Sequence, residues 1–406
     1  MRIALLADTY PPENRGGAGI VVERLARRFT ALGHDTLVVS TSRSTDSDRE
    51  QDGVRVVRFR SAYPERFRSF VAMRNPLMTG KVARALRFFK PDVVHAHNVH
   101  QHLSFGSLGA AALTGAPVAY TAHDYLLFCA IKLVSTGGEV DYRQRWFNCA
   151  KCQRLRWNPV RNTAIRRAMS KHVDHLFAIS VALQTALRAN AYGGAEVIYN
   201  GVDPDWWIDG NGGRFRAAHG LGDAPVALLA ARISRDKGAE AAVRALARSR
   251  VKELRLVIAG DNPRYAAKLR AMAQELNVAD RLVLPGWLTP ETLRDAYHAA
   301  AVTLAPSTYP DPFGLTLIES MACGTPAIAS VFGGGPEVVA DGVTGFVANP
   351  LDTPALADRM DLLVENQGRT ARMRTSSIQR VRDLFTLDQQ VARTLARYDA
   401  LRRTAA

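Results

Sequence analysis

The stretch Tyr309–Pro326 (Y-P-D-P-F-G-L-T-L-I-E-S-M-A-C-G-T-P) constrains the fold most, because it joins a chain-breaking loop to a helix that carries a carboxylate. A proline and a glycine interrupt the chain just after Asp311, whereas Leu315–Ala322 is helix-like and contains Glu319. Asp311 is therefore predicted in the loop and Glu319 inside the helix. Such a helix start suits an anionic ligand such as a pyrophosphate. An ordinary amphipathic helix with Glu319 on its solvent face is the alternative.

Strand-like and helix-like segments alternate along most of the chain, as in doubly wound α/β domains. Arg2–Ala7 is predicted as the first strand, Asp8–Gly19 as a loop and Ile20–Leu32 as a helix. Gly16 and Gly17 would let the backbone of this loop approach a ligand closely, and a flexible turn is the alternative. Further strands are expected at 35–40, 54–59, 117–121, 175–179, 226–231, 254–259, 281–284, 302–305 and 327–330, and the polar residues 41–53 are expected to form a loop.

The length of 406 residues suits two domains, and the composition, 47% hydrophobic and 22% charged, is typical of a globular protein. No apolar run approaches the roughly 20 residues that span a bilayer. The run Ile3–Ala7 is too short for a signal peptide and is closed by Asp8, so we expect a cytoplasmic protein.

The positive charge is concentrated in the first half of the chain. Residues 1–200 carry 28 Lys and Arg against 15 Asp and Glu, a net +13, and the rest of the chain carries a net +2. Within 55–90, basic residues alternate with aromatic ones, which favours contact with an anionic membrane surface on the inner face of the plasma membrane. The alternative is that the aromatics form core and the arginines a solvated helix face.

Histidines follow two predicted strands. His97 and Asn98 end the run P-D-V-V-H-A-H-N, and His123 follows the strand 117–121. Because ligands of open α/β sheets bind at the carboxyl ends of strands, His123 is placed aptly for a site. A lone histidine is more often a satisfied structural residue.

Residues 126–162 do not follow the strand and helix alternation and are interpreted as an insertion. The insertion contains Cys129, Cys149 and Cys152, and the C-x-x-C pair could supply half of a structural zinc site. Reduced, uncoordinated thiols are the favoured alternative, because no second C-x-x-C pair is present. Basic and aromatic residues at 143–157 make the insertion a candidate membrane or acceptor contact.

A second α/β domain begins at Val226. Its first strand ends in A-R-I-S-R-D-K-G, which places Arg232 and Lys237 in a loop before a helix. Two cations beside a helix start would hold a diphosphate and neutralise the charge that develops on a leaving nucleotide. Ordinary surface charge is the alternative.

Several of these motifs resemble those of retaining glycosyltransferases of family 4. The stretch around Asp311 and Glu319 is similar to the family's P-E-P-F-G-x-x-x-x-E-A-M-A-x-G-x-P, with Asp311 in place of the usual Glu, and A-R-I-S-R-D-K-G is similar to its G/A-R-x-x-x-x-K-G. The N-G-V-D run that begins at Asn200 resembles the family's interdomain hinge. The resemblance implies the GT-B fold, an α/β architecture of two Rossmann-like domains facing across a cleft. The expected parts are an acceptor-binding domain (1–196), a nucleotide-sugar-binding domain (197–384) and a last helix (385–406) that packs on the first domain.

The resemblance also implies a reaction, namely transfer with retention from a UDP- or GDP-sugar to a glycan, a lipid-linked saccharide or a small molecule. No metal or cofactor is expected to take part. Arg232 and Lys237 would stabilise the diphosphate, Glu319 would bind the ribose and Asp311 a sugar hydroxyl. His123 would lie beside the donor sugar, and His97 and Asn98 are weaker candidates for the acceptor side. Further donor contacts are expected from Gly16, Gly17, Trp287, Leu288, Phe313, Gly314 and Leu315.

Two alternatives remain open. A sugar-nucleotide epimerase or a phosphorylase could use the same fold. A nucleic-acid-binding protein is suggested by the pI of about 10.0, but the chain has no recognised nucleic-acid motif and no compact basic run.

Overall fold

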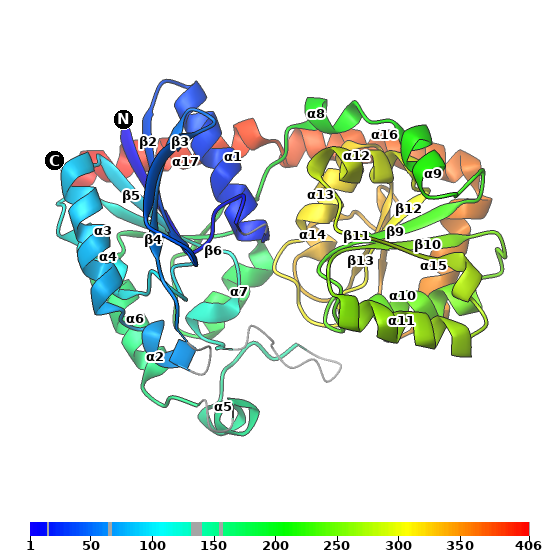
Figure 1. The fold of residues 1–406 in the computed structure, drawn as a ribbon, viewed down its shortest axis with the longest axis horizontal. Coiled ribbons are helices and arrows are strands. Elements are labelled where there is room, and N and C mark those ends of the chain that lie inside the picture. The colour runs from blue at the N-terminus through cyan, green and yellow to red at the C-terminus, as the bar shows by residue number, and fades with distance from the viewer. Residues whose placement is uncertain (14–15, 64–66, 131–139, 154–156, 406) are drawn as a thin grey trace. The chain divides into compact units, whose positions relative to one another are not determined.

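The computed structural model describes residues 1–13, 16–63, 67–130, 140–153 and 157–405. The chain divides into two compact units, which we call unit 1 (Met1–Val134, Asp141–Tyr199 and Leu387–Ala406) and unit 2 (Ser135–Val140 and Asn200–Thr386). Each unit is built on its own mainly parallel sheet with helices packed on it (Figure 1). Three basic residues of the basic and aromatic stretches, Arg66, Arg154 and Arg156, lie outside the described residues.

The unit 1 sheet has the order β3-β4-β2-β1-β5-β6-β7-β8. All of its neighbouring strands are parallel except β3 and β4. Figure 1 shows these strands between α1 on one side and α3 on the other. The strands are β1 Arg2–Ala7, β2 Asp35–Ser42, β3 Ser47–Gln51, β4 Val54–Arg60, β5 Val93–His97, β6 Val118–Ala122, β7 His175–Ala178 and β8 Glu196–Val197. The helices are α1 Gly17–Ala31, α2 Arg68–Val71, α3 Pro76–Phe89, α4 Gly106–Ala112, the 3₁₀ turn η2 Tyr125–Leu127, α5 Trp146–Gln153, α6 Arg161–His172, α7 Val181–Ala189 and α17 Leu387–Ala405.

The predicted polar loop at 41–53 is wrong, because it contains strand β3, which pairs antiparallel with β4. The strand consists of polar and charged residues at the edge of the sheet, so it carries no hydrophobic alternation. The signal that could have found it is the dipeptide Asp52-Gly53, whose φ angles of 52° and 76° form a two-residue hairpin turn. Helix α1 likewise begins at Gly17 rather than Ile20, because its first residues lack apolar periodicity.

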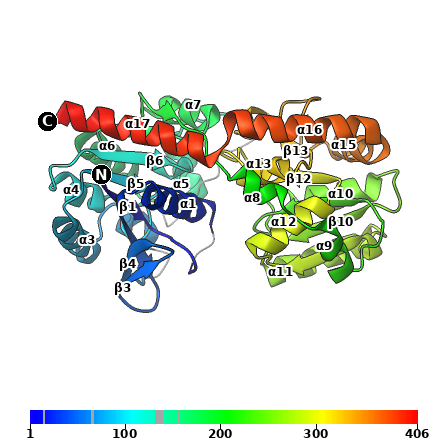
Figure 2. The same ribbon diagram turned by 90° about the horizontal axis from the view of Figure 1, so that it is seen from above.

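The last helix, α17, belongs to unit 1 (Figure 2). The Tyr398 hydroxyl lies 2.5 Å from Nδ1 of His95 on β5. The Tyr398 ring also packs against Phe29 of α1, with 6.0 Å between centroids. Arg28 forms an ion pair of 2.8 Å with Asp388 at the start of the helix. Residues that are distant in the sequence thus complete the core of unit 1.

The unit 2 sheet is fully parallel, with the order β11-β10-β9-β12-β13-β14. Figure 1 shows its strands between α12 on one side and α10 and α11 on the other. The strands are β9 Val226–Ala230, β10 Arg255–Ala259, β11 Leu282–Gly286, β12 Val302–Ala305, β13 Ala327–Ser330 and β14 Gly345–Ala348. The helices are α8 Pro204–Ile208, α9 Gly212–Ala218, α10 Ala239–Arg248, α11 Pro263–Glu275, η4 Ala279–Arg281, α12 Pro290–Ala299, α13 Leu315–Ala322, α14 Gly335–Val338, α15 Thr353–Glu365 and α16 Gln367–Leu384.

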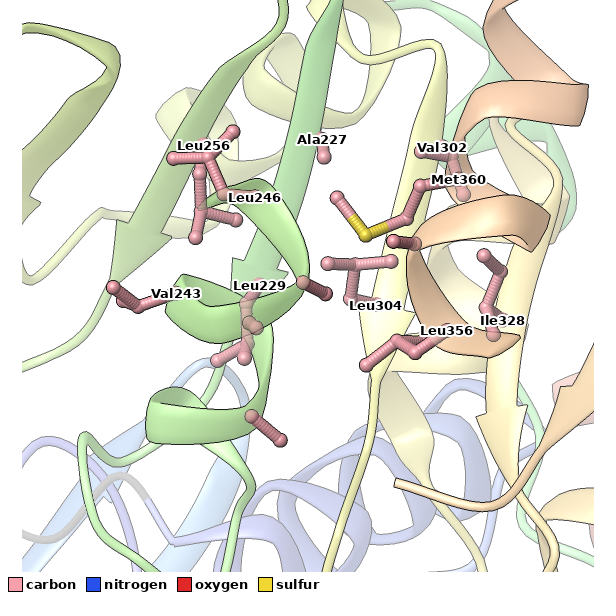
Figure 3. Close-up of a cluster of buried hydrophobic side chains, with 14 of the residues drawn as sticks. Ala227, Leu229, Val243, Leu246, Leu256, Val302, Leu304, Ile328, Leu356 and Met360 are labelled. Atoms are coloured by element: carbon pink, nitrogen blue, oxygen red, sulfur yellow. The ribbon is translucent and has the colours of Figure 1, made fainter. Parts of the chain in front are cut away.

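The core of unit 2 lies between its sheet and helices α10 and α15 (Figure 3). Leu229 and Leu256 of neighbouring strands contact Val243 and Leu246 of α10, and Met360 of α15 closes the cluster. These side chains are at most 1% exposed, so their burial holds the strands in register. Among the described residues, no helix combines the length and the apolar character needed to cross a membrane.

Candidate active site

In unit 2, β9 and β12 are neighbours in the sheet although β10 and β11 lie between them in the sequence. The strand order therefore reverses between β9 and β12, and open α/β sheets bind ligands at such a point, beyond the carboxyl ends of the two strands. Arg232 and Lys237 lie in the loop after β9, and Asp311 lies in the loop after β12. The topology thus brings together residues that are more than 70 positions apart.

The two loops are locked together by backbone contacts. The Thr308 amide donates to the carbonyl of Asp236, at 2.9 Å. Gly238 has a φ of +77°, and a Cβ at this position would lie 1.8 Å from the carbonyl oxygen of Pro306. Only glycine fits at such a close approach, so the glycine of the K-G motif sets the distance between the loops.

The Lys237 ammonium forms an ion pair with the Asp311 carboxylate. The Ser307 hydroxyl donates to the same carboxylate oxygen at 3.3 Å, and the ammonium lies 5.2 Å from the centre of the Tyr309 ring. Burial alone would lower the pKa of Lys237, but attraction to Asp311 and Tyr309 outweighs it and raises the pKa. Lys237 is therefore a fixed cation whose side chain is still 22% exposed. Sequence reasoning assigned Lys237 and Asp311 separate roles and missed Ser307 and Tyr309.

Arg232 has a different environment from Lys237. Its side chain is 70% exposed, and it donates one hydrogen bond of 3.1 Å to Asp236 four residues later. An exposed pair of this kind contributes little to stability. The guanidinium of Arg232 is consequently free to change partner when an anion arrives.

Helix α13 begins where sequence analysis expected it. Gly314 precedes it with a φ of +92°, and no side chain caps the helix start. The amides of the first turn thus point toward the loop that carries Asp311. Glu319 lies in this helix as predicted, but it is 6% exposed, which excludes the solvent-face alternative. Its Oε2 is 3.5 Å from the Tyr297 hydroxyl.

The glycine-rich turn 333–335, which follows β13, packs against the backbone of the loop that carries Asp311. The backbone of Gly333 forms a parallel bridge with Asp311, and the Gly334 amide donates to the Asp311 carbonyl at 2.8 Å. A Cβ on Gly333 would lie 2.2 Å from that carbonyl oxygen, and one on Gly334 would lie 2.3 Å from the carbonyl of Pro312. This glycine turn is therefore a backbone support for Asp311.

The other predicted donor contacts differ in accessibility. Trp287 is 46% exposed and Leu288 is half-buried, and both follow the edge strand β11. Leu315 is half-buried at the start of α13. Phe313 is buried and packs edge-on against Phe385 at 5.9 Å, so its ring belongs to the core of unit 2.

In unit 1, the structure brings His97, Asn98 and His123 together. His97 Nδ1 lies 2.9 Å from His123 Nε2 across the neighbouring strands β5 and β6. The Asn98 side chain accepts from the His123 amide at 3.1 Å and donates to Asp124 at 3.0 Å. All three predicted residues are buried to more than nine-tenths. Burial and the neighbouring His95 hold the pKa of His97 well below its usual value, so His97 is neutral.

At the start of unit 1, Gly16 immediately precedes α1, and Gly17 is the first residue of the helix. No side chain caps this helix start either. Sequence reasoning missed the buried Asp8, whose carboxylate accepts from the amides of Gln101, His102 and Leu103 at 2.5 to 2.8 Å. Asp8 thereby ties the loop after β1 to the loop after β5.

The predicted cysteine site gains no support from the described residues. Cys129 and Cys149 are buried and Cys152 is exposed, and none of these three described cysteines is part of a disulfide. The Cys149 thiol donates to the Gln144 side chain at 3.1 Å. In the described ranges, no group of three or more His, Cys, Asp or Glu residues is arranged to hold a metal ion.

Family models and relatives agree with this architecture. Residues 15–206 match the model "Glycosyltransferase Family 4", and residues 213–380 match "Glycosyl transferases group 1". An alpha-maltose-1-phosphate synthase of Mycobacterium tuberculosis is 30% identical over 375 residues, which cover 86% of this chain and 84% of the relative. An uncharacterized glycosyltransferase of Methanocaldococcus jannaschii is 25% identical over 376 residues, which cover 91% of this chain and 90% of the relative.

Two solved structures share the fold. Sucrose-phosphate synthase from Thermosynechococcus elongatus superposes with a TM-score of 0.78 at 22% identity and covers 98% of both chains. Anabaena HepE in complex with UDP-glucose superposes with a TM-score of 0.75 at 21% identity, covering 97% of this chain and 99% of that one. The predicted fold is confirmed, and the chain belongs to the group 1, family 4 glycosyltransferases of GT-B architecture.

Proposed function

We propose that this glycosyltransferase moves a sugar from a nucleotide-diphosphate sugar to a hydroxyl of a saccharide-containing acceptor, with retention at the anomeric carbon. The observation that carries the proposal is the Lys237–Asp311 ion pair. It lies in the loops after strands β9 and β12, directly before the start of α13, which no side chain caps. A fixed ammonium, an exposed guanidinium and helix amides form a diphosphate site.

The charges of the site indicate how a donor would bind. A diphosphate competes with Asp311 for the Lys237 ammonium, and Arg232 can leave the weak bond to Asp236 to reach a phosphate oxygen. Asp311 is then available to accept from a hydroxyl of the donor sugar. We propose that these groups, rather than a metal ion, neutralise the charge on the leaving diphosphate.

Glu319 and Trp287 are proposed to recognise the nucleoside. A carboxylate buried in α13 binds ribose hydroxyls well, because its orientation is held by the surrounding core. Trp287 offers an exposed aromatic face to the base, with Leu288 beside it. His123, oriented by His97 and Asn98, remains the candidate in unit 1 for contact with the donor sugar.

Retention is proposed to follow from front-face transfer. Asp311 is engaged by Lys237 and is assigned to a sugar hydroxyl, and Glu319 is assigned to the ribose, so neither is proposed as a nucleophile. The bond between the anomeric carbon and the diphosphate oxygen breaks while the acceptor oxygen bonds to the same face of that carbon. The proton of the acceptor hydroxyl passes to the departing diphosphate oxygen.

The names of relatives support this class of reaction. A GDP-mannose-dependent mannosyltransferase of Mycolicibacterium smegmatis that acts on a phosphatidylinositol monomannoside is 32% identical over 229 residues. The Anabaena structures contain UDP or UDP-glucose. UDP- and GDP-sugars are therefore the first donors to test, and cell-envelope glycans or glycolipids are the proposed products.

A thermal-shift screen of the purified chain against UDP, GDP, ADP and their sugar conjugates tests the proposal. A ligand at about 100 times its Kd stabilises the folded state by about 2.7 kcal/mol. Stabilisation by one nucleotide series should disappear in Lys237→Ala and Glu319→Ala. It should persist in Arg248→Ala, which removes an exposed arginine at the opposite end of α10.

Proton NMR of the product from the stabilising donor then reports the anomeric configuration. Inversion, or turnover of the donor into another sugar nucleotide without any acceptor, would overturn the proposal. Failure of every nucleotide to stabilise the protein would also reject it.

A further inference from the structure

Unit 1 contains a ligand-sized pocket that the proposed donor chemistry does not use. The pocket has a volume of about 340 Å³ and is lined by residues 128, 144, 146, 149, 157–159, 161–163, 166 and 189–192, which come from the insertion, α6 and the end of α7. Its lining includes none of the residues proposed to bind the donor and no Asp or Glu. A pocket of this size, with polar groups that converge on it, is typical of small-molecule sites.

The base of the pocket holds a buried cation, Arg161, which forms no ion pair with a described residue and feels the Asp124 carboxylate only at longer range. Arg161, the first residue of α6, is 3% exposed. Its guanidinium donates to the Leu126 carbonyl at 2.5 Å and to the Asn162 side chain at 2.8 Å, and both acceptors are neutral. Arg161 makes no ion pair within the described part of the chain. Burial lowers its pKa, which reflects the cost of a desolvated charge.

The polar rim of the pocket presents further donors. Arg166 is exposed on α6 and lines the same space. The Gln144 side-chain oxygen accepts from Cys149, so its amide NH₂ group is left to donate. In Asn158 the side-chain oxygen accepts from the Val160 amide, and the NH₂ group donates one weak hydrogen bond of 3.9 Å to the Met73 sulfur, which leaves its second N–H. These groups select a ligand rich in oxygen acceptors, with an anionic group near the two arginines.

One wall of the pocket is aromatic. The rings of Trp146 and Trp157 lie 6.4 Å apart, inclined by 34°, and Trp146 is 72% exposed. A large exposed ring beside hydrogen-bond donors matches a pyranose, which has an apolar C–H face and a hydroxyl edge. Nucleic acid or a membrane would require an open surface, whereas this pocket is sized for one small molecule.

We propose that this pocket in unit 1 binds a sugar phosphate, with the phosphate at Arg161 and Arg166 and the sugar ring against the tryptophans. The phosphate supplies the ion-pair partner that Arg161 lacks, and the sugar ring packs on the exposed ring of Trp146. This inference stands independently of the proposed transferase reaction, because none of the pocket residues acts on the donor.

Calorimetric titration of the full chain tests the inference with glucose 6-phosphate, mannose 6-phosphate and glucose 1-phosphate, and separately with glucose and inorganic phosphate. At least one sugar phosphate should bind more tightly than glucose alone and more tightly than inorganic phosphate alone. Arg166→Ala should weaken it about ten-fold, since a charge-assisted bond is lost. Arg167→Ala, which removes the neighbouring exposed arginine outside the pocket, should leave the affinity within about two-fold.

Two further variants separate this pocket from the donor site. Trp146→Ala should lower the affinity for the sugar phosphate toward that of inorganic phosphate, whereas Lys237→Ala should leave it unchanged. No binding of any sugar phosphate at millimolar concentration would overturn the inference. So would equal losses in Arg166→Ala and Arg167→Ala, or binding that disappears in Lys237→Ala and survives in Arg166→Ala, because that ligand occupies the donor site.

Discussion

Replacing Gly333 by Ala should damage the candidate donor site through the backbone alone. Gly333 has a φ of +80°, where a residue with a Cβ loses about 1–2 kcal/mol. Its added Cβ would also lie 2.2 Å from the Asp311 carbonyl oxygen. Ordinary contact begins at 3.4 Å, so the Asp311 loop must move by about 1.2 Å. Overpacking of this kind costs a further 1–3 kcal/mol or so.

Gly342→Ala is the matched control. Gly342 lies in the same unit with a φ of +73°, but nothing lies within 4 Å of the Cβ that it would gain. Gly342→Ala should therefore show only the backbone strain of about 1–2 kcal/mol, whereas Gly333→Ala should lose about 2–5 kcal/mol in all.

The assay has two parts. Urea unfolding gives the free energy of unfolding of each variant, and turnover of the preferred nucleotide sugar is measured where both variants are folded. A shift of about 1 Å in the Asp311 carboxylate should lower turnover about 100-fold in Gly333→Ala, while Gly342→Ala should keep nearly full activity. Equal losses of stability in the two variants, or undiminished turnover in Gly333→Ala, would refute the role assigned to this glycine turn.

Three other predictions address separate features. Lys237→Ala should weaken UDP or GDP binding by about 10- to 100-fold in calorimetry, and an affinity within two-fold of the original would contradict the phosphate role. His95 and His97 are buried with pKa values well below normal, so stability should be complete above about pH 6.5 and fall by about 1.4 kcal/mol per pH unit per histidine below it. Denaturation between pH 6.5 and 5 measures this slope, which His97→Asn should reduce. Phe88 is 79% exposed on the basic unit 1, and Phe88→Ser should weaken sedimentation with anionic vesicles; equal binding to neutral vesicles would argue against membrane contact.

The local part of the candidate site was predictable from the sequence. The proline and glycine after Asp311 keep this part of the chain in a loop, and the apolar run after Gly314 forms α13 with Glu319 inside it. Both features depend on neighbours in the chain, where backbone restriction and helical periodicity act directly. Strand β3 was not predicted, because a charged edge strand is stabilised by pairing with its neighbour β4 and shows no hydrophobic alternation of its own.

What the sequence by itself determined is the alternation of strands and helices, the approximate bounds of most strands and the residue types at each loop. Only the tertiary structure decided that Lys237 pairs with Asp311, that Gly333 supports the Asp311 backbone, and that His97 contacts His123. These contacts join residues far apart in the chain, and they arise from the order in which parallel strands assemble. Strand order is selected by the packing of the whole core, so no local pattern records it.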